Sequence, residues 1–162
     1  MRIGVYPGTF DPITYGHTDI IARSLQIFDT VIVAVAPNPS KRPLFDLAHR
    51  VKMVKHATRG LQRVRVEPFN GLLVHHARKR KAQAVIRGLR ATSDFEYEFQ
   101  MTLVNRKLDR SIETVFLVPS QEYSYLTSSI IKEVASFGGP VDDFVHPYVA
   151  TQLIQKLRRQ HP

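Results

Sequence analysis

Five short apolar runs rich in β-branched residues recur at regular intervals, and they constrain the fold of this chain more than any other feature. The runs are Ile3–Tyr6, Val31–Ala36, Val64–Val66, Ala84–Ile86 and Val115–Val118. Each is apolar nearly throughout, as in strands that are buried on both faces of a parallel sheet. They therefore predict five strands of one buried sheet.

Stretches with helical spacing separate these runs. The predicted helices lie on the apolar stripes Ile21–Leu25–Phe28 and Leu47–Val51–Val54, and at residues 71–81, 93–108, 128–137 and 147–159. Asp46 is a plausible N-cap of the second helix. The alternation predicts a single-domain, doubly wound, Rossmann-like α/β fold, with a parallel five-stranded sheet and helices on both faces. We expect one domain over residues 1–162, with the C-terminal helices at about 128–160 packed on it.

The composition limits the classes of function. The chain has no cysteine, which excludes disulfides, thiolate metal sites and a cysteine nucleophile. It has no apolar stretch near the ~20 residues of a membrane span, and its start lacks the apolar core of a signal peptide. We therefore expect a cytoplasmic protein without a membrane partner.

The formal net charge of +9 indicates anionic partners. The densest basic run, Arg78–Lys81, is interpreted as the solvated last turn of a helix, where cations suit the macrodipole. The other basic residues are scattered along the chain, which does not favour a nucleic-acid patch. We expect no nucleic-acid partner.

The first predicted strand runs into the segment Pro7–His17, which contains two prolines and two glycines. Its motifs are Gly8-Thr9-Phe10-Asp11-Pro12 and Thr14-Tyr15-Gly16-His17. Such a connection is stiff, turns tightly and exposes backbone amides. In α/β folds the ligand lies outside the carboxyl ends of the strands, and phosphates bind where a strand end faces a helix N-terminus. Thr9 and His17 are therefore candidate phosphate-binding residues, although an ordinary loop with His17 as a helix cap would also fit.

Further candidates follow the later strands. Lys41 follows the second strand, in a loop stiffened by prolines. After the fourth strand, Gly88 would allow close approach to a ligand, and Arg87 and Arg90 can each hold phosphate oxygens with a guanidinium fork. The segment Tyr123–Ser129 follows the fifth strand and offers hydroxyls and amides at a helix start, where Thr127 or Ser128 could also act as a cap.

These residues resemble a known family. Gly8–Pro12 with Thr14–His17 is similar to the nucleotidylyltransferase superfamily in its Thr-x-Gly-His form, and the whole chain resembles the bacterial phosphopantetheine adenylyltransferases. The supporting segments are Pro39–Lys41, Ile86–Arg90, Asp94–Glu98, Asn105–Arg106, and Tyr123–Ser129 followed by Lys132–Glu133. The resemblance implies transfer of AMP from ATP to 4′-phosphopantetheine, giving dephospho-coenzyme A and pyrophosphate in the penultimate step of coenzyme A biosynthesis.

The resemblance also implies roles for individual residues. His17 would hold the transferring α-phosphate, Thr9 would orient the attacking phosphate, and Lys41 would neutralise charge between them. Arg90 would hold the departing pyrophosphate. Contacts to ATP are implied for Thr9, Phe10, His17, Gly88, Leu89, Arg90, Glu98, Tyr123, Ser124, Tyr125, Leu126, Thr127, Ser128 and Ser129. Contacts to phosphopantetheine are implied for Thr9, Lys41, Leu73 and Arg87.

The family needs Mg²⁺, which we expect to be carried mainly by ATP phosphates and water rather than by metal ligands of the protein. The resemblance further implies a homohexamer and feedback inhibition by coenzyme A. His75 departs from the acidic residue that relatives often carry in the third helix, which leaves the contacts to the pantetheine arm open.

Two alternatives remain at this point. Another nucleotidylyltransferase, with nicotinamide mononucleotide or a polyol phosphate as acceptor, usually has histidine at the position of Thr14. A basic nucleic-acid-binding module without catalysis would suit the net charge, but the set of Thr9, His17, Lys41 and Arg90 favours an enzyme.

Overall fold

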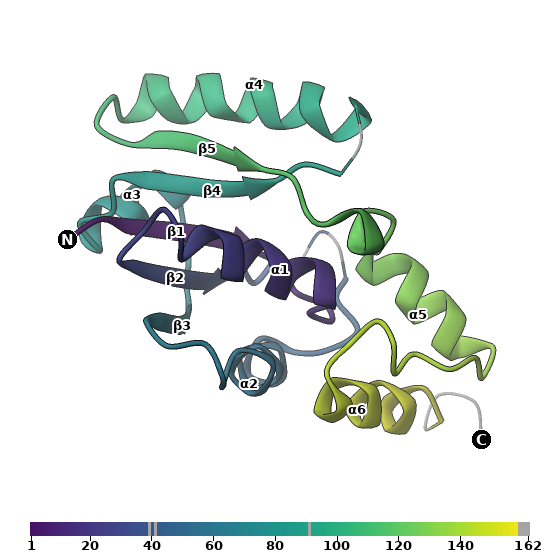
Figure 1. The fold of residues 1–162 in the computed structure, drawn as a ribbon. Coiled ribbons are helices and arrows are strands. Elements are labelled where there is room, and N and C mark those ends of the chain that lie inside the picture. The colour runs from purple at the N-terminus through teal and green to yellow at the C-terminus, as the bar shows by residue number, and fades with distance from the viewer. Residues whose placement is uncertain (39, 41, 91, 159–162) are drawn as a thin grey trace.

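The computed structural model describes residues 1–38, 40, 42–90 and 92–158. Strands and α-helices alternate up to the last strand, which is followed by a short 3₁₀ helix and then by further α-helices (Figure 1). The elements are β1 (Ile3–Gly8), α1 (Tyr15–Ser24), β2 (Thr30–Val35), α2 (Leu47–Ala57), β3 (Val64–Pro68), α3 (Leu73–Lys79), β4 (Ala84–Gly88), α4 (Thr92–Leu108), β5 (Glu113–Leu117), η2 (Gln121–Tyr123), α5 (Ser128–Ser136) and α6 (Pro147–Arg158).

The five strands form one parallel sheet in the order β3-β2-β1-β4-β5. β1 is central, and Gly4 pairs with Val31 of β2 on one side and with Ala84 of β4 on the other. The chain therefore builds the sheet in one direction from β1 to β3 and in the other from β4 to β5. The predicted doubly wound α/β fold is confirmed, and its topological switch point lies between β1 and β4.

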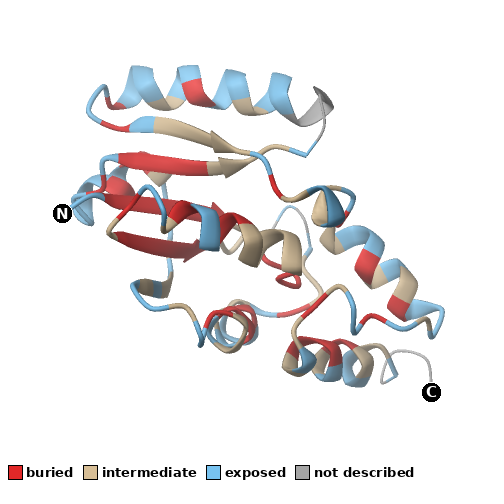
Figure 2. Ribbon diagram, in the orientation of Figure 1, coloured by how far each residue is buried: buried red, intermediate tan, exposed pale blue. Residues whose placement is uncertain are grey.

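The helices cover both faces of the sheet, and β2 shows this clearly. Its side chains alternate between two apolar clusters, because successive residues of a strand point to opposite faces. Val31, Val33 and Val35 pack with buried residues of α1, α2, α5 and α6. Ile32 and Ala34 pack in the second cluster, which includes a buried residue of α3. The inner strands β1, β2 and β4 are accordingly mostly buried (Figure 2). The outer strands β3 and β5 are only partly buried, so the expectation that all five strands are buried on both faces is wrong for these two, each of which has a neighbouring strand on one side alone.

The first helix ends earlier than its apolar stripe predicts. α1 stops at Ser24, so Leu25 and Phe28 lie beyond it. The chain continues as a tightened turn in which the Ser24 carbonyl accepts from the amides of Ile27 (3.0 Å) and Phe28 (2.9 Å). The spacing of the stripe survives through that turn, and Phe28 is still buried.

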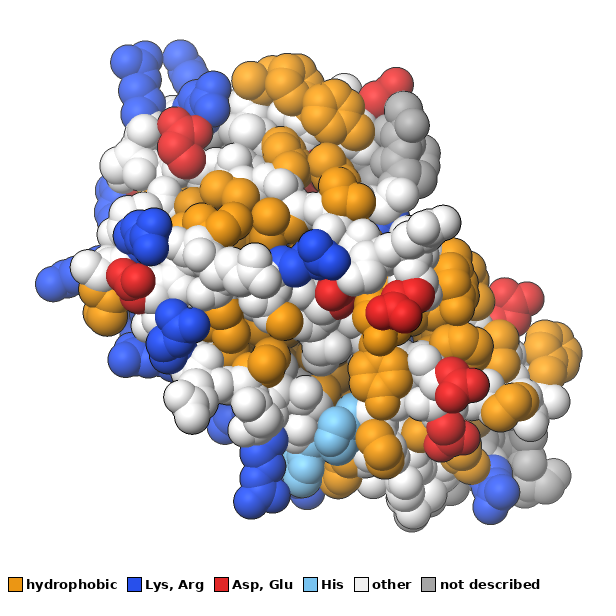
Figure 3. Space-filling view, in the orientation of Figure 1, with side chains coloured by type: hydrophobic (Ala, Val, Ile, Leu, Met, Phe, Trp, Pro, Cys, Tyr) orange, Lys and Arg blue, Asp and Glu red, His pale blue; other side chains and the backbone are white. Residues whose placement is uncertain are grey.

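Helix α4 lies along the outer strand β5 (Figure 1), and many of its apolar side chains are exposed. Figure 3 shows a gathering of apolar side chains over this helix. The exposed apolar residues of α4 are Phe95, Tyr97, Phe99, Met101, Leu103, Val104 and Leu108. In the part of the chain that the structure describes, no helix combines the length and the apolar character needed to cross a membrane.

Candidate active site

The loops that follow β1, β2, β4 and β5 all lie at the carboxyl edge of the sheet, because every strand is parallel. They carry the segments that the sequence singles out. The loop after β1 and the loop after β4 flank the switch point directly, which is where ligands bind in open α/β sheets.

His17 is held at the start of α1 by a capping box. The helix begins at Tyr15 with Thr14 as N-cap, so His17 is its third residue and not its first. The Thr14 amide donates to His17 Nδ1 at 3.0 Å, and Thr14 Oγ1 lies at the same distance from that nitrogen. An Nδ1 that accepts a hydrogen bond carries no proton, so the neutral ring carries its proton on Nε2.

The surroundings keep His17 neutral. Burial, and to a smaller extent the nearby Arg90 guanidinium, lower the pKa of His17 from 6.5 to about 4. The ring also makes an edge contact with Phe10, with ring centroids 5.2 Å apart. At neutral pH this imidazole is a fixed hydrogen-bond donor through Nε2, not a cation and not a base.

The loop between β1 and α1 is anchored by the buried carboxylate of Asp11. Its two oxygens accept hydrogen bonds from the amides of Leu44 (2.8 Å) and Phe45 (2.9 Å), just before α2. Lys132 of α5 forms an ion pair with the same carboxylate at 2.8 Å. Asp11 therefore joins the loop after β1 to two elements that are distant in the sequence.

Thr9 lies at the end of β1, beside the loop after β2. Its hydroxyl accepts a hydrogen bond of 3.0 Å from the Asn38 side-chain amide. Its carbonyl accepts one of 2.6 Å from Arg50, a buried residue of α2. Lys41, predicted in the same loop, lies outside the described residues.

The loop after β4 places its two arginines in different contacts. Arg87 forms a bidentate ion pair with Glu98 of α4 through Nε (2.6 Å) and NH2. Arg90 donates to the carbonyl of Leu126 at 3.3 Å, which links this loop to the segment after β5. The family resemblance implies that Arg87 contacts phosphopantetheine and that Glu98 contacts ATP. In the structure these two residues contact each other.

Gly88 and Leu89 are fixed by the protein itself. A Cβ at Gly88 would lie 3.3 Å from Ile20 Cγ1, so glycine allows α1 to approach β4 closely. The Leu89 amide donates to the carbonyl of Leu117 at 2.9 Å. The packing of α1 accounts for the glycine without a ligand.

The segment after β5 contacts the start of α1 and leads into α5. Thr127 is the N-cap of α5, as expected, and accepts from the Ile130 amide at 3.1 Å. The Ser128 hydroxyl donates to the carbonyl of Pro12 at 2.8 Å, and the Tyr123 ring packs against Tyr15. The segment is therefore joined to the loop that carries His17. The remaining predicted residues here are Ser124, whose hydroxyl donates to Gln121, buried Leu126, and exposed Tyr125 and Ser129.

Leu73 lies at the first position of α3, where it packs against the cluster on the other face of the sheet. His75, two residues later, is exposed.

Two sets of contacts that hold the site's loops together were not predicted from the sequence. Asp19 of α1 accepts hydrogen bonds from the amide (2.7 Å) and hydroxyl (3.0 Å) of Ser120, and so fixes the segment after β5 to α1. Arg50 contacts the ends of β1 and β2. A signal for Arg50 exists, because it falls between Leu47, Val51 and Val54 on the buried stripe of its helix.

The basic run at the end of α3 lies at the opposite edge of the sheet from these loops. Arg78 pairs with Asp109 at 2.6 Å and Arg80 pairs with Glu67 at 2.5 Å. All four residues of the run are exposed. The basic run is thus a solvated helix end whose arginines form ion pairs, which agrees with its interpretation from the sequence.

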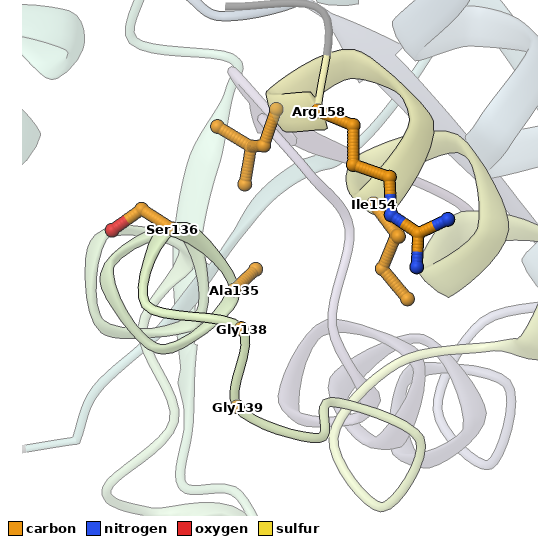
Figure 4. A pocket seen from close by; sticks show the side chains of 7 residues that line it. Ala135, Ser136, Gly138, Gly139, Ile154 and Arg158 are labelled. Atoms are coloured by element: carbon orange, nitrogen blue, oxygen red, sulfur yellow. The ribbon is translucent and has the colours of Figure 1, made fainter. Parts of the chain in front are cut away.

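An apolar cavity of about 240 Å³ lies between α5 and α6. Figure 4 shows Ile154 and Arg158 on one side and the turn at Gly138 and Gly139 on the other. None of the candidate site residues lines it. The cavity is therefore separate from the carboxyl-edge loops, which carry the candidate phosphate-binding residues.

Comparisons with known proteins agree with this geometry. A family profile described as cytidylyltransferase-like matches residues 5–134. The chain is 53% identical to "Phosphopantetheine adenylyltransferase" of Caldanaerobacter subterraneus subsp. tengcongensis, over 98% of this chain and 99% of that protein. It is also 53% identical to the protein of the same name from Heliobacterium modesticaldum, over 96% of this chain and 93% of that protein.

A solved structure is similar in fold. The crystal structure of a putative nicotinate-nucleotide adenylyltransferase from Vibrio parahaemolyticus superposes with a TM-score of 0.74, at 18% identity, over 99% of this chain and 97% of that one. At that identity the likeness concerns the fold alone.

Proposed function

The chain belongs to the cytidylyltransferase-like family and, within it, to the phosphopantetheine adenylyltransferases, and from this membership we propose that it transfers AMP from ATP to 4′-phosphopantetheine. The products are dephospho-coenzyme A and pyrophosphate. The observation that carries the proposal is the near-complete match at 53% identity. The candidate site supports it, since the motif residues gather at the switch point of the sheet.

The chemistry needs alignment and charge stabilisation more than proton transfer. The attacking phosphate is already an anion, so the reaction requires no general base. A neutral His17 with its proton on Nε2 suits this requirement, because it can donate to the α-phosphate as negative charge accumulates there. The capping box holds the ring before the substrate arrives, which lowers the cost of reorganisation.

The other residues take the roles that the family membership suggests. Thr9 orients the attacking phosphate, Lys41 neutralises charge between the two substrates, and Arg90 holds the departing pyrophosphate. The hydrogen bond from Arg90 to Leu126 supports this assignment, since it places the guanidinium next to the segment Tyr123–Ser129.

Arg87 and Leu73 are proposed contacts of the phosphopantetheine. Glu98 is a proposed contact of the nucleotide, together with Phe10, Gly88, Leu89 and the segment after β5. Arg87 and Glu98 form an ion pair, so the proposed contact of phosphopantetheine and the proposed contact of the nucleotide would hold each other in place.

We expect Mg²⁺ to enter the site bound to ATP rather than to ligands of the protein. Among the described residues, no group of three or more histidine or carboxylate side chains gathers in a way that could hold a metal ion. The hydroxyls and cations at the carboxyl edge suit phosphate oxygens, so Mg²⁺ would be carried by ATP and water. When bound, it would neutralise charge on the phosphates.

We also propose a homohexamer in the cytoplasm that coenzyme A inhibits. The exposed apolar side chains of α4 support an assembly, because an exposed patch of this kind typically marks an interface. Membership of the family supports inhibition by coenzyme A, and so does the chemical similarity of coenzyme A to the product, dephospho-coenzyme A.

The test is pyrophosphate release from Mg·ATP with 4′-phosphopantetheine, beside reactions with nicotinamide mononucleotide and without an acceptor. Release is expected only with 4′-phosphopantetheine. The variant His17→Asn should lower kcat by about 10²–10³, the usual cost of removing a donor to transition-state charge. His161→Ala, a histidine change near the end of the chain, serves as the control and should keep full activity.

Equal losses in the two histidine variants would contradict the role of His17. Release with nicotinamide mononucleotide but not with 4′-phosphopantetheine would contradict the acceptor. Silence with every acceptor, in folded protein that binds ATP, would contradict the proposed reaction.

A further inference from the structure

Arg50 of α2 is a fully buried charged side chain whose guanidinium binds backbone carbonyls. It is 1% exposed. Nε donates to the carbonyl of Phe45 (3.0 Å), and NH1 donates to those of Thr9 (2.6 Å) and Ala36 (2.6 Å). NH2 donates to the carbonyl of Pro37 at 3.0 Å. Four carbonyl oxygens thus share one cation.

These carbonyls belong to two connections, the one after β1 and the one between β2 and α2. Thr9 follows β1, Ala36 and Pro37 follow β2, and Phe45 precedes α2. The strands β1 and β2 are adjacent and parallel, so the loops that follow them leave the sheet at the same edge. Arg50 lies beneath this edge and fixes the distance between the two loops.

The two loops meet above Arg50 through their side chains. The Asn38 amide donates to the Thr9 hydroxyl at 3.0 Å. Arg50 holds the carbonyl of Thr9 itself and that of Pro37, the residue before Asn38. The position of the Thr9–Asn38 pair is therefore set from below by a single side chain.

An arginine in this place is costly for stability alone. A buried cation loses its hydration, and well-packed apolar residues often stabilise a fold as much or more. Its use here is geometric. The planar guanidinium offers five N–H donors in fixed directions, and it makes four hydrogen bonds to carbonyl oxygens. Lysine has three donors on one nitrogen and cannot span the same carbonyls.

We propose that Arg50 is the positioning residue of the acceptor-phosphate side of the site: it fixes the loops after β1 and β2 so that the Thr9 hydroxyl and the Asn38 amide present one preformed edge to the attacking phosphate. This inference rests on the proposed function, which assigns Thr9 to that phosphate. Of the proposed ATP contacts, only Thr9 and Phe10 lie on the loops that Arg50 fixes, and the others lie on α1, α4, the end of β4 and the segments after β4 and β5.

The experiment compares Arg50→Lys with Arg63→Lys. Arg63 is an exposed control, because its guanidinium also donates to backbone carbonyls, those of Leu25 (3.3 Å) and Phe28 (3.5 Å), but at the amino edge of the sheet. Three quantities are measured for each variant: kcat/KM for 4′-phosphopantetheine at saturating Mg·ATP, the Kd of ATP without acceptor, and the Tm.

A misplacement of about 1 Å can cost about 10²-fold in rate. Arg50→Lys is therefore expected to lower kcat/KM for the acceptor by about 10²-fold, while the Kd of ATP stays within about twofold of wild type. Arg63→Lys is expected to change neither quantity. If Arg50 had only a structural role, Arg50→Lys would lower the Tm and weaken the binding of both substrates together.

Two outcomes would overturn the inference: Arg50→Lys with acceptor kinetics close to wild type, or parallel losses for acceptor and ATP. If Arg50→Lys does not fold, Asn38→Gly decides instead, since Asn38 is half-exposed and has a φ of 41°, which glycine adopts without strain. Asn38→Gly should lower kcat/KM for the acceptor and leave ATP binding unchanged, and unchanged acceptor kinetics would overturn the inference. A silent wild type would contradict the proposed function, whereas an active wild type with an active Arg50→Lys contradicts only the role of Arg50.

Discussion

At the scale of the residue, the hydrogen bonds of His17 decide its chemistry. The Thr14 amide occupies Nδ1, so the only N–H of the neutral ring is at Nε2. The same contact caps the first helix. One interaction thus sets both the position and the tautomer of the ring, and a cap is here compatible with a functional role.

The low pKa of His17 predicts a particular dependence of stability on pH. The ring titrates near 6.5 in the unfolded chain and near 4 in the folded one. Between these values the unfolded state binds a proton that the native state does not, so the free energy of unfolding falls as the pH falls from about 6.5 to about 4. Chemical denaturation at pH 7 and pH 5 should show a larger loss for wild type than for His17→Asn, which cannot titrate.

The other histidines are present in both proteins, so their contributions cancel in this comparison. An NMR titration of the ring resonances gives an independent check and should place the midpoint for His17 near 4. A midpoint close to 6.5 would contradict the burial of the ring and its neutral state.

The residues of the candidate site were only partly predictable from the sequence. Motif and strand order placed His17, Thr9 and Arg90 at the correct edge of the sheet. The pairing of Arg87 with Glu98 was not predictable, because it depends on how α4 lies against β4. Arg50 was missed because an arginine in a helix is usually exposed, although its place on the apolar stripe of α2 was a signal of burial.

At the scale of the element, α5 is joined to the loop after β1 by polar contacts as well as by packing. Lys132 forms an ion pair with Asp11, and Ser128 donates to Pro12. The side chain of Asp11 is 5% exposed and that of Lys132 29%. These contacts hold the helix start that follows Tyr123–Ser129 close to the loop of His17.

Removing Lys132 should therefore loosen α5 at this point. Lys132→Met leaves a buried carboxylate with only its two backbone donors, which should lower the free energy of unfolding by about 1–3 kcal/mol. The Kd of ATP should also rise, since the segment before α5 loses its anchor. Denaturant titration and ATP binding measure the two effects. Lys156→Met, an exposed change on α6, should stay within about 0.5 kcal/mol of wild type, and an equal effect of both changes would contradict the role of the ion pair.

The elements themselves were largely predictable, with errors at their ends. All five strands appear where the apolar runs indicate. Burial on both faces explains the nearly continuous apolar composition of β1, β2 and β4, whereas β3 and β5 are only partly buried. The end of α1 was predicted too late, since the tightened turn after Ser24 keeps the helical spacing of Leu25 and Phe28. Periodicity does not distinguish an α-helix from a final turn with shorter hydrogen bonds.

At the scale of the whole molecule, α4 presents a surface that a single chain leaves uncovered. Leu103 and Val104 on this helix are 49% and 51% exposed, and Phe95 and Phe99 stack on each other nearby. Apolar side chains of this size on an exposed helix favour the proposed assembly of several copies.

A charge on this surface should dissociate the assembly. Leu103→Glu would bury a carboxylate without a partner in a copy-to-copy contact, which is strongly unfavourable. Light scattering after gel filtration should give the monomer mass for Leu103→Glu and a larger mass for wild type. Gln155→Glu introduces the same charge on exposed α6 and should leave the mass unchanged. A wild-type mass equal to that of Leu103→Glu would contradict an interface at α4.

The strand order has a consequence for how the chain is made. β1 emerges first from the ribosome, yet its partner β4 follows about 80 residues later, as the pairing of Gly4 with Ala84 shows. At about 5–20 residues per second, one edge of β1 stays without a partner for several seconds during synthesis. A chain that stops before β4 would expose that edge, which is a template for pairing with other chains. Premature termination would thus yield a product that is both inert and prone to aggregate.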